Sequence, residues 1–322
     1  MKQIIAPIDR ELLLVELTPE KMLRKTNKAG NEIYVLNHHN APNTMLEIGR
    51  LRELTFRAAG GGTGKEVDID SYDTDDVPYE QLIVWNPDQQ EILGGYRYIL
   101  CKNLPKNEKG EVHLATSRLF KFSTEFVEDF LPYVIELGRS FVQPDYQSSK
   151  AGAKGLFALD NLWDGLGALM INHPEMLYFF GKVTMYTSYN VDARNLILYF
   201  FDRYFGDDDK LVYPFEPMSV SLDTDRLDRM FDGLNYDEGY KVLSVEVRKL
   251  GEKIPPLINA YMGLSPTMRT FGTVVNNHFG EVEETGIMID IDEMYDGKIN
   301  RHVSSYLDQI AENNEVPMIR FQ

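Results

Sequence analysis

Cysteine is almost absent from this sequence of 322 residues: Cys101 is the only one, so a disulfide framework is excluded. Scarce cysteine is typical of a reducing compartment. The chain also has no uncharged apolar run near the roughly 20 residues that a membrane-spanning helix needs. Its opening segment, MKQIIAPIDRELLLVEL, acquires charges too early for a signal peptide. We therefore expect a cytoplasmic protein, with room for peripheral attachment at the inner face of a membrane.

Positive charge is scarce as well. Lys and Arg total 33 against 50 Asp and Glu, which gives a formal net charge of −17. Nucleic-acid binding needs a basic footprint, so we expect no nucleic-acid partner. The imbalance is uneven, because residues 66–80 carry seven acids and no base, whereas residues 94–123 carry six bases and two acids. A basic segment on an acidic chain indicates either a solvated loop or a docking surface for an acidic partner.

A metal-ligand pattern is missing. The six histidines are scattered apart from the adjacent pair His38 and His39, and neighbouring side chains of a regular element seldom converge on one ion. The acids Asp68, Asp70 and Asp73 depart from the Asp-x-Asp-x-Asp-Gly spacing of an EF-hand calcium loop. We therefore expect no metal site.

Apolar and aromatic residues are abundant: 43% of the chain is hydrophobic, with 18 Tyr and 17 Phe, which predicts a folded globular protein. Hydrophobic periodicity predicts strands at 31–37, 176–188 and 210–217, a hairpin over 81–101, a short helix leading into a strand over 123–142, and helices at 45–58, 159–174, 191–205 and 236–251. This order predicts a mixed α+β fold around one central sheet, with an acidic elaboration at 206–238. We expect a single domain made of an N-terminal extension at 1–30, a core at 31–205 and a C-terminal extension at 206–322.

The helix at 45–58 has start and stop signals. Thr44 is a candidate N-cap, and Glu47 three residues later completes a capping box. Apolar residues then recur at helical spacing, and the glycines from Gly60 onward end the helix because glycine adopts positive φ readily.

The stretch after this helix, RAAGGGTGKEVDID at 57–70, superficially resembles a phosphate-binding loop. A P-loop needs four residues between its glycine and the Gly-Lys-Ser/Thr end. Here the spacing is one residue short, and Glu66 stands where a hydroxyl is required. The P-loop is rejected, which leaves two interpretations. The glycines either let the following acids fold back over a site or form a surface loop.

Charged residues interrupt strands that are otherwise apolar. Arg97 lies in the predicted hairpin, and Glu136 and Arg139 lie in the strand YVIELGRSFV. A buried charge needs a partner, so we expect these residues to meet one another or the acids at 68–73. Arg52 and Phe56, four apart on the helix, share one face.

The order of these residues resembles that in acyl-homoserine-lactone synthases, which are GNAT-type N-acyltransferases. The shared pattern is Arg52-x-x-x-Phe56, Asp70-x-x-Asp73, Gly94-Gly95-Tyr96-Arg97 and Glu136-x-x-Arg139. Four blocks are similar to the related hemolysin-like N-acyltransferases of ornithine- and glycine-lipid synthesis: IELGRSFVQPDYQ, LFALDNLWDGLGALM, LYFFGKVTMY and KIPPLINAYMGLSP. The resemblance covers about residues 30–290 and implies a GNAT-like central twisted sheet with helices on both faces.

The resemblance implies that an acyl thioester acylates the amine of an amino acid, with no covalent enzyme intermediate. An ammonium must lose a proton before it attacks, and Glu136 is the first candidate for the base. Arg139, Asp70 and Asp73 complete the candidate catalytic set; the two acids either attract the substrate ammonium or hold the arginines. The candidate substrate-binding residues, including backbone amides for the oxyanion, are Arg52, Phe56, Arg97, Ser140, Phe141 and Val142.

The acyl donor is expected to be acyl carrier protein. The superfamily's pyrophosphate loop should follow the Glu136 strand, but QPDYQSSKAGAKG has no clean copy of it. Acyl-CoA is therefore less favoured, and no bound cofactor is expected. Candidate docking residues for the acidic carrier are Lys102, Lys106, Arg118, Lys121, Lys150 and Lys154.

A second interpretation is a non-enzymatic, membrane-active or lipid-binding protein of the hemolysin type. The stretches LYFFGK and LILYFFDRYF supply aromatic residues for lipid contact. Aromatic residues at strand or helix spacing more often belong to a core, so the enzyme is favoured. Glycine, ornithine and other amino acids all remain candidates for the acceptor.

Overall fold

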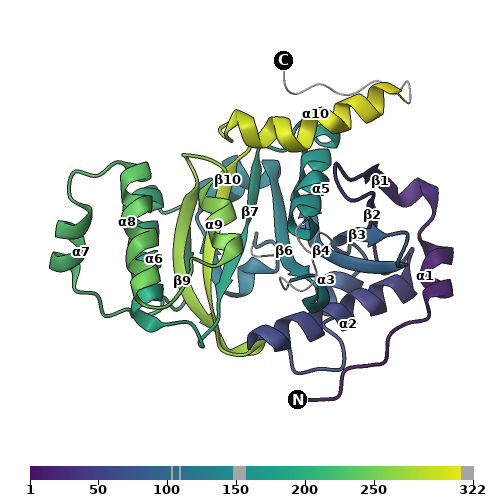
Figure 1. Ribbon diagram of the computed structural model, residues 1–322, viewed down its shortest axis with the longest axis horizontal. Helices are drawn as coiled ribbons and strands as arrows, with labels where there is room; N and C mark the ends of the chain where they lie inside the picture. The colour runs from purple at the N-terminus through teal and green to yellow at the C-terminus, as the bar shows by residue number, and fades with distance from the viewer. Residues whose placement is uncertain (103, 109, 148–156, 313–322) are drawn as a thin grey trace. The chain divides into compact units, whose positions relative to one another are not determined.

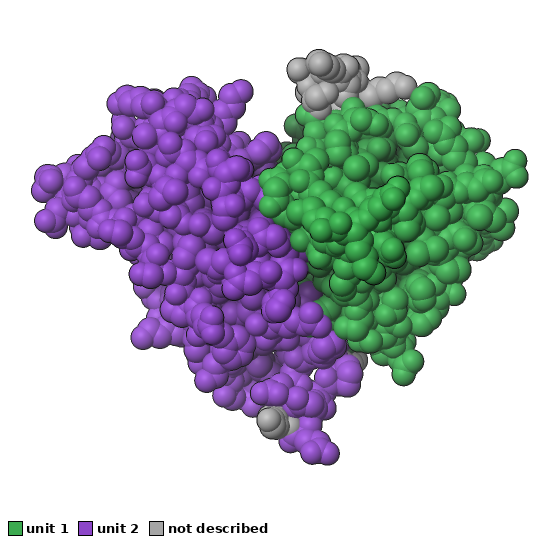
Figure 2. Space-filling view, turned by 90° about the horizontal axis from the view of Figure 1, so that it is seen from below, with its two compact units in different colours: residues 1–103, 133–177, 294–322 green, residues 104–132, 178–293 purple. Residues whose placement is uncertain are grey.

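The computed structural model describes residues 1–102, 104–108, 110–147 and 157–312 (Figure 1). The chain forms two compact units, coloured green and purple in Figure 2. Unit 1 comprises residues 1–103, 133–177 and 294–322, and unit 2 comprises residues 104–132 and 178–293. Each unit is therefore assembled from segments far apart in the sequence.

Unit 1 contains five strands in the order β1-β2-β3-β4-β6, and each strand is antiparallel to its neighbour. The strands are β1 (Met22–Lys25), β2 (Glu32–Leu36), β3 (Glu80–Asn86), β4 (Glu91–Leu100) and β6 (Val134–Val142). The helices of unit 1 are α1 (Arg10–Glu16), α2 (Pro42–Ala59), α3 (Ser71–Thr74), α5 (Ala158–Asn172) and α10 (Asp296–Glu312).

Helices cover both faces of the unit 1 strands (Figure 1). The side chain of Gln81 on β3 bonds to Arg52 of α2. Its neighbour Leu82 packs on α5, since a Cβ at Gly165 would lie 2.6 Å from Leu82 Cδ2. Successive strand residues point to opposite faces, so α2 and α5 lie on opposite sides of β3.

Unit 2 contains a second group of antiparallel strands, β7 (Tyr178–Met185), β10 (Val282–Asp290) and β9 (Arg269–Asn276), with β10 between the other two. A separate ribbon pairs β5 (Phe120–Phe122) with β8 (Val212–Pro214). The helices of unit 2 are α6 (Val191–Phe205), α7 (Thr224–Phe231), α8 (Tyr236–Lys249) and α9 (Pro256–Met262), preceded by a short π-helical turn at Phe126–Phe130.

The predicted fold class is confirmed, as a mixed α/β fold with a large sheet and helices on both of its faces. The predicted hairpin is β3–β4, and the predicted strands and helices correspond to β2, β6, β7, β8, α2, α5, α6 and α8. The prediction that all strands belong to one central sheet was wrong for the strand predicted at 210–217. That strand is the short β8, which pairs with β5 in a separate two-stranded sheet. In the portion of the chain described here, no helix is long and apolar enough to cross a membrane.

The predicted start of α2 was also wrong. The helix begins at Pro42, with Ala41 as N-cap, and neither Thr44 nor Glu47 forms the expected capping box. Glu16, at the end of α1, caps the helix instead. Its carboxylate accepts bonds from Asn43 N at 3.0 Å and Thr44 N at 2.7 Å, and from both side chains at 2.8 Å. A carboxylate from a distant segment thus satisfies the free N–H groups of the first turn.

Replacing Glu16 with glutamine is expected to lower the free energy of unfolding by about 1–2 kcal/mol, because the amide loses the charge that complements the helix N-terminus. Burial raises the pKa of Glu16, but hydrogen bonds from Thr44 and Asn43 outweigh burial and lower it below the ordinary value of 4.5. The stabilisation is therefore complete above the unfolded-state pKa and is lost as pH falls through the folded-state pKa.

Urea unfolding of the wild type and the Glu16→Gln variant at about pH 7 and again well below pH 4.5 measures this effect. The exposed Glu66, which lies outside the helices and strands, is replaced in the same way as the control and should change stability little. A difference between wild type and variant that is unaffected by acidification contradicts the charged cap.

Candidate active site

Two aspartates of the short helix α3 form the centre of the candidate site. Asp70 is the N-cap of α3 and Asp73 its third residue, and they form a reciprocal capping box. The backbone N of Asp70 donates to Asp73 Oδ2 at 3.1 Å. Both carboxylates are therefore held by a defined turn.

Arg52 reaches Asp73 from α2. Its Nη1 lies 3.2 and 3.3 Å from the two carboxylate oxygens of Asp73, and its Nη2 donates to Oε1 of Gln81. Gln81 in turn donates from Nε2 to Asp73 Oδ1 at 3.1 Å. Arg52, Asp73 and Gln81 are all 0% exposed. Charges buried this deeply require paired and hydrogen-bonded partners, and Gln81 supplies one of these hydrogen bonds to Arg52 and another to Asp73.

Arg97 joins the same carboxylates from β4. Its Nη1 donates to Asp70 Oδ1 at 2.7 Å and to Asp73 Oδ2 at 3.2 Å. The guanidinium carbon lies 5.5 Å from the ring centroid of Tyr72 and 5.2 Å from that of Tyr79. Ring faces favour a cation within about 6 Å, so two aromatic rings and two carboxylates together hold Arg97.

Charge outweighs burial at the centre of the cluster. Burial disfavours the ionised form of Asp73, but Arg52 and Arg97 overcome that effect and lower its pKa. Burial likewise disfavours the charged guanidinium of Arg97, but Asp73 and Asp70 overcome it and raise the pKa of Arg97. Asp73 therefore stays an anion and Arg97 a cation.

Strand β6 adds Glu136 and Arg139. Glu136 lies opposite Ile99 of β4 and is 1% exposed, and Tyr79 donates its hydroxyl to Glu136 Oε2. The pairing of β4 with β6 shifts between Gly95 and Arg97, so that two residues of β6 face one of β4. Such a bulge re-aims a side chain, and here it lies at Arg139.

Arg139 itself adopts a left-handed backbone conformation, with φ +48. That conformation costs about 1–2 kcal/mol for a residue with a Cβ. Asp68 binds the guanidinium with two bonds, 2.7 Å from Nε and 3.1 Å from Nη2. Arg139 Nη2 also lies 3.6 Å from Asp70 Oδ2. Asp68 and Arg139 thus complete a cluster of three arginines and three aspartates, whose formal charges cancel.

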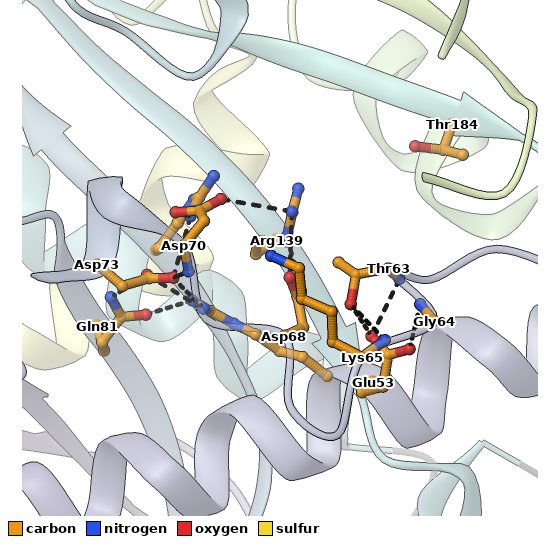
Figure 3. A network of polar contacts seen from close by, with 12 residues as sticks. Glu53, Thr63, Gly64, Lys65, Asp68, Asp70, Asp73, Gln81, Arg139 and Thr184 are labelled. Carbon is orange, nitrogen blue, oxygen red and sulfur yellow. Dashed lines mark hydrogen bonds and ion pairs between the residues drawn. The ribbon is translucent and has the colours of Figure 1, made fainter. Parts of the chain in front are cut away.

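The glycine-rich stretch is anchored to α2 in a defined conformation (Figure 3). Gly60 ends α2 with φ +99. Glu53, buried on α2, then accepts from Thr63 N at 3.0 Å, Thr63 Oγ1 at 2.7 Å and Gly64 N at 2.7 Å. The backbone N of Asp68 donates to Gly49 O at 3.0 Å. These contacts agree with the interpretation in which the acids fold back over a site.

The predicted convergence of charges is therefore found. Arg52, Asp70, Asp73, Arg97 and Arg139 form one network, and Glu136 is linked to it through Tyr79. Arg97, counted above in the basic segment, is 2% exposed and belongs to this network instead. The catalytic and binding roles of these residues stay predictions.

The remaining predicted residues lie around the network or elsewhere. Phe56 is buried one turn after Arg52. Phe141 is buried on β6, between the half-buried Ser140 and Val142. Of the docking residues, Lys102, Lys106, Arg118 and Lys121 are exposed, whereas Lys150 and Lys154 lie outside the described residues. Lys102 lies 3.5 Å from Glu175.

Sequence reasoning missed Tyr79, Gln81 and Glu53 as parts of the site. Gln81 shares a signal with Arg97, since it is a polar residue at the start of an apolar strand. The signal for Glu53 is weaker: positions 45, 49 and 53 are spaced four apart and therefore share one face of α2. Tyr79 has no local signal, because its partner Glu136 is 57 residues away.

Among the described ranges, no group of three or more His, Cys, Asp or Glu side chains is placed to hold a metal ion.

Comparison with known proteins shows the family to which the chain belongs. Residues 51–155 match the family described as Acetyltransferase (GNAT) domain. A glycine N(alpha)-acyltransferase of Phocaeicola vulgatus is 56% identical over 97% of this chain and 96% of that protein. One from Bacteroides thetaiotaomicron is 55% identical over 98% of this chain and 94% of that protein.

Among solved structures, a CoA-dependent acyl-homoserine lactone synthase, BjaI, has a TM-score of 0.39 and 11% identity, covering 88% of this chain and 90% of that one. The relatives above confirm the enzyme interpretation over a passive lipid-binding protein. The chain belongs to the GNAT-type N-acyltransferase family that includes these two glycine N(alpha)-acyltransferases, and it is an acyltransferase.

Proposed function

We propose that this enzyme transfers a fatty acyl group from a thioester to the amine of glycine, forming an N-acylglycine for aminolipid synthesis. The acceptor is suggested by the names of the two relatives. The observation that carries the proposal is a pair of opposite charges at the most exposed part of the network, formed by Asp70 and Arg139.

The exposed fractions of the side chains distinguish this pair from the rest of the network. They are 19% for Asp70 and 14% for Arg139, against 2% or less for Arg52, Asp68, Asp73 and Arg97. The 3.6 Å between Arg139 Nη2 and Asp70 Oδ2 exceeds a normal hydrogen bond. A glycine zwitterion matches the pair, with its ammonium at Asp70 and its carboxylate at Arg139. Asp73 bonds to both buried arginines, and its proposed role is to hold them in position.

Glu136 is the proposed base. It takes a proton from the glycine ammonium, directly or through a water molecule, and the neutral amine then attacks the thioester carbonyl. The C–N bond forms, the C–S bond breaks, the nitrogen loses its second proton, and the departing thiolate is protonated. Backbone N–H groups at residues 139–142 are proposed to stabilise the oxyanion.

Direct transfer fits the environment of the one cysteine. Cys101 is buried next to the backbone of Glu136, and burial, followed by the charge of Glu136, raises the pKa of its thiol well above the ordinary value. The thiolate is the nucleophilic form of cysteine. An acyl-cysteine intermediate on Cys101 is therefore disfavoured.

The proposed donor is an acyl carrier protein. Lys102, Lys106, Arg118 and Lys121 are exposed on a chain whose formal net charge is −17. Exposed basic side chains are suited to steering an acidic partner. Because the product carries a fatty chain, we also propose that the enzyme makes peripheral contact with a membrane.

The direct test offers the purified enzyme one amino acid at a time together with either acyl carrier protein or acyl-CoA, with mass spectrometry as the readout. N-Acylglycine is the expected product, formed faster from the carrier-bound donor. Ornithine and alanine, offered separately, are the alternative acceptors. No N-acylglycine from either donor contradicts the function, whereas efficient use of acyl-CoA contradicts only the choice of donor.

A further inference from the structure

Arg139 is held in place by a residue outside the pattern Glu136-x-x-Arg139. Asp68 is 1% exposed and accepts two bonds from one edge of the guanidinium, at Nε and Nη2. Two parallel charge-assisted bonds fix the orientation of a guanidinium as well as its position. With this edge occupied by Asp68, Nη2 is also directed toward Asp70, 3.6 Å away.

Asp68 is in turn positioned by α2. Its backbone N donates to Gly49 O at 3.0 Å. This close approach depends on Gly49, because a Cβ there would lie 2.6 Å from Ile69 Cγ1 and 3.4 Å from Asp68 O. One turn further along α2, Glu53 holds Thr63 and Gly64 through three bonds. Residues four apart lie on one helix face, so one face of α2 anchors both ends of the segment at 63–68.

The backbone of Arg139 makes such support necessary. Its φ of +48 is unfavourable for any residue other than glycine. Strained residues persist where the surrounding structure over-determines them. The bond pair to Asp68 joins the bulge of β6 to α2, through a loop that is itself anchored at two points.

We propose that Asp68, held by Gly49 and Glu53, is the positioning residue that orients Arg139 for the carboxylate of the amino-acid substrate. This inference rests on the proposed function, in which Arg139 binds that carboxylate. Asp68 itself does not touch the substrate. Its effect on catalysis passes through the guanidinium of Arg139.

A double-mutant cycle tests this role with Asp68→Asn, Arg139→Gln and the double variant, measuring kcat and KM for glycine with acyl carrier protein as donor. Asp68→Asn keeps the size of the side chain but removes its charge. It is expected to lower kcat/KM by roughly 10- to 100-fold, mainly through KM, because Arg139 loses its orientation. In the Arg139→Gln background the same change should have almost no further effect.

Gly49→Ala provides an independent route to the same result. The added methyl group displaces Ile69 and, through the backbone, its neighbour Asp68. KM for glycine should therefore rise in the wild-type background and not in Arg139→Gln. Gly297→Ala is the matched control, since a Cβ at Gly297 meets nothing within 4 Å. Its kinetics should equal those of the wild type.

The outcomes separate this inference from the proposed function. An active wild type in which Asp68→Asn leaves KM unchanged, or has an equal effect in both backgrounds, overturns the positioning role alone. A wild type that makes no N-acylglycine overturns the proposed function and this inference with it. If Asp68→Asn loses its cooperative unfolding transition, Gly49→Ala replaces it in the test. Gly49→Ala must then show the same coupling to Arg139.

Discussion

Replacing Glu136 with glutamine is expected to lower kcat for glycine acylation by about 10²- to 10⁴-fold, which is the usual contribution of general base catalysis. Glutamine keeps the shape of the side chain and can still accept the hydroxyl of Tyr79, which bonds to Glu136 Oε2 in the structure. It cannot take the proton from the glycine ammonium. Steady-state kinetics should therefore show a fall in kcat with little change in KM for glycine, because Glu136 is not proposed to bind the zwitterion.

The same strand system offers a matched control for this prediction. Glu91, at the start of β4, accepts a bond from the hydroxyl of Tyr146, so Glu91→Gln removes an equivalent charge from a Tyr–Glu pair outside the arginine–aspartate cluster. Its kcat should stay close to that of the wild type. Equal kcat values for Glu136→Gln and wild type, with both proteins folded by circular dichroism, exclude Glu136 as the base.

Much of the fold was predictable because its signals are local. Asn86-Pro87 marks the turn of the β3–β4 hairpin, and Gly60 and Gly206 end α2 and α6 as expected. The N-terminus of α2 was not predictable in this way, because its cap, Glu16, comes from another helix. A helix end satisfied from a distance leaves no pattern within the helix itself.

Strands β9 and β10 were also missed, and for β10 the reason is related. β10 contains Glu283 and Glu284 in succession, a pattern that argues against a strand when it is taken alone. In the structure Glu284 is buried and bonds to Lys182 of β7 and Asn276 of β9. The partners that stabilise this buried charge lie on neighbouring strands, so the sequence of β10 alone does not reveal them.

The site was predictable to the extent that buried charges must pair. Arg97, Glu136 and Arg139 stood among apolar strand residues, which was sufficient to predict that they meet the acids at 68–73. The sequence did not fix which acid holds which arginine. That assignment depends on the turn of α3 and on the anchored loop before it, and it separates the fully buried Asp73 from the partly exposed Asp70.

Replacing Asp73 with asparagine is expected to lower the free energy of unfolding by about 3–5 kcal/mol, because it leaves two buried arginines short of a carboxylate. Arg52 is 0% and Arg97 2% exposed, so neither reaches water to compensate. Burial disfavours the Asp73 anion, but Arg52 and Arg97 lower its pKa. The stabilisation is therefore present above the unfolded-state pKa and is lost only as pH falls through the lower folded-state pKa. Urea unfolding at about pH 7 measures the difference.

Two further variants identify the cause of that loss. Asp76→Asn, exposed in the same acidic segment, should change stability by no more than about 0.5 kcal/mol. In Asp73→Asn, Arg97 keeps its ion pair with Asp70, whereas Arg52 loses its ion pair with Asp73. Adding Arg52→Met removes that uncompensated buried charge, so the double variant should recover part of the stability despite carrying one more substitution. If the second substitution instead deepens the loss, then hydrogen bonding and packing around Asp73, and not an uncompensated charge, hold the centre of this site together.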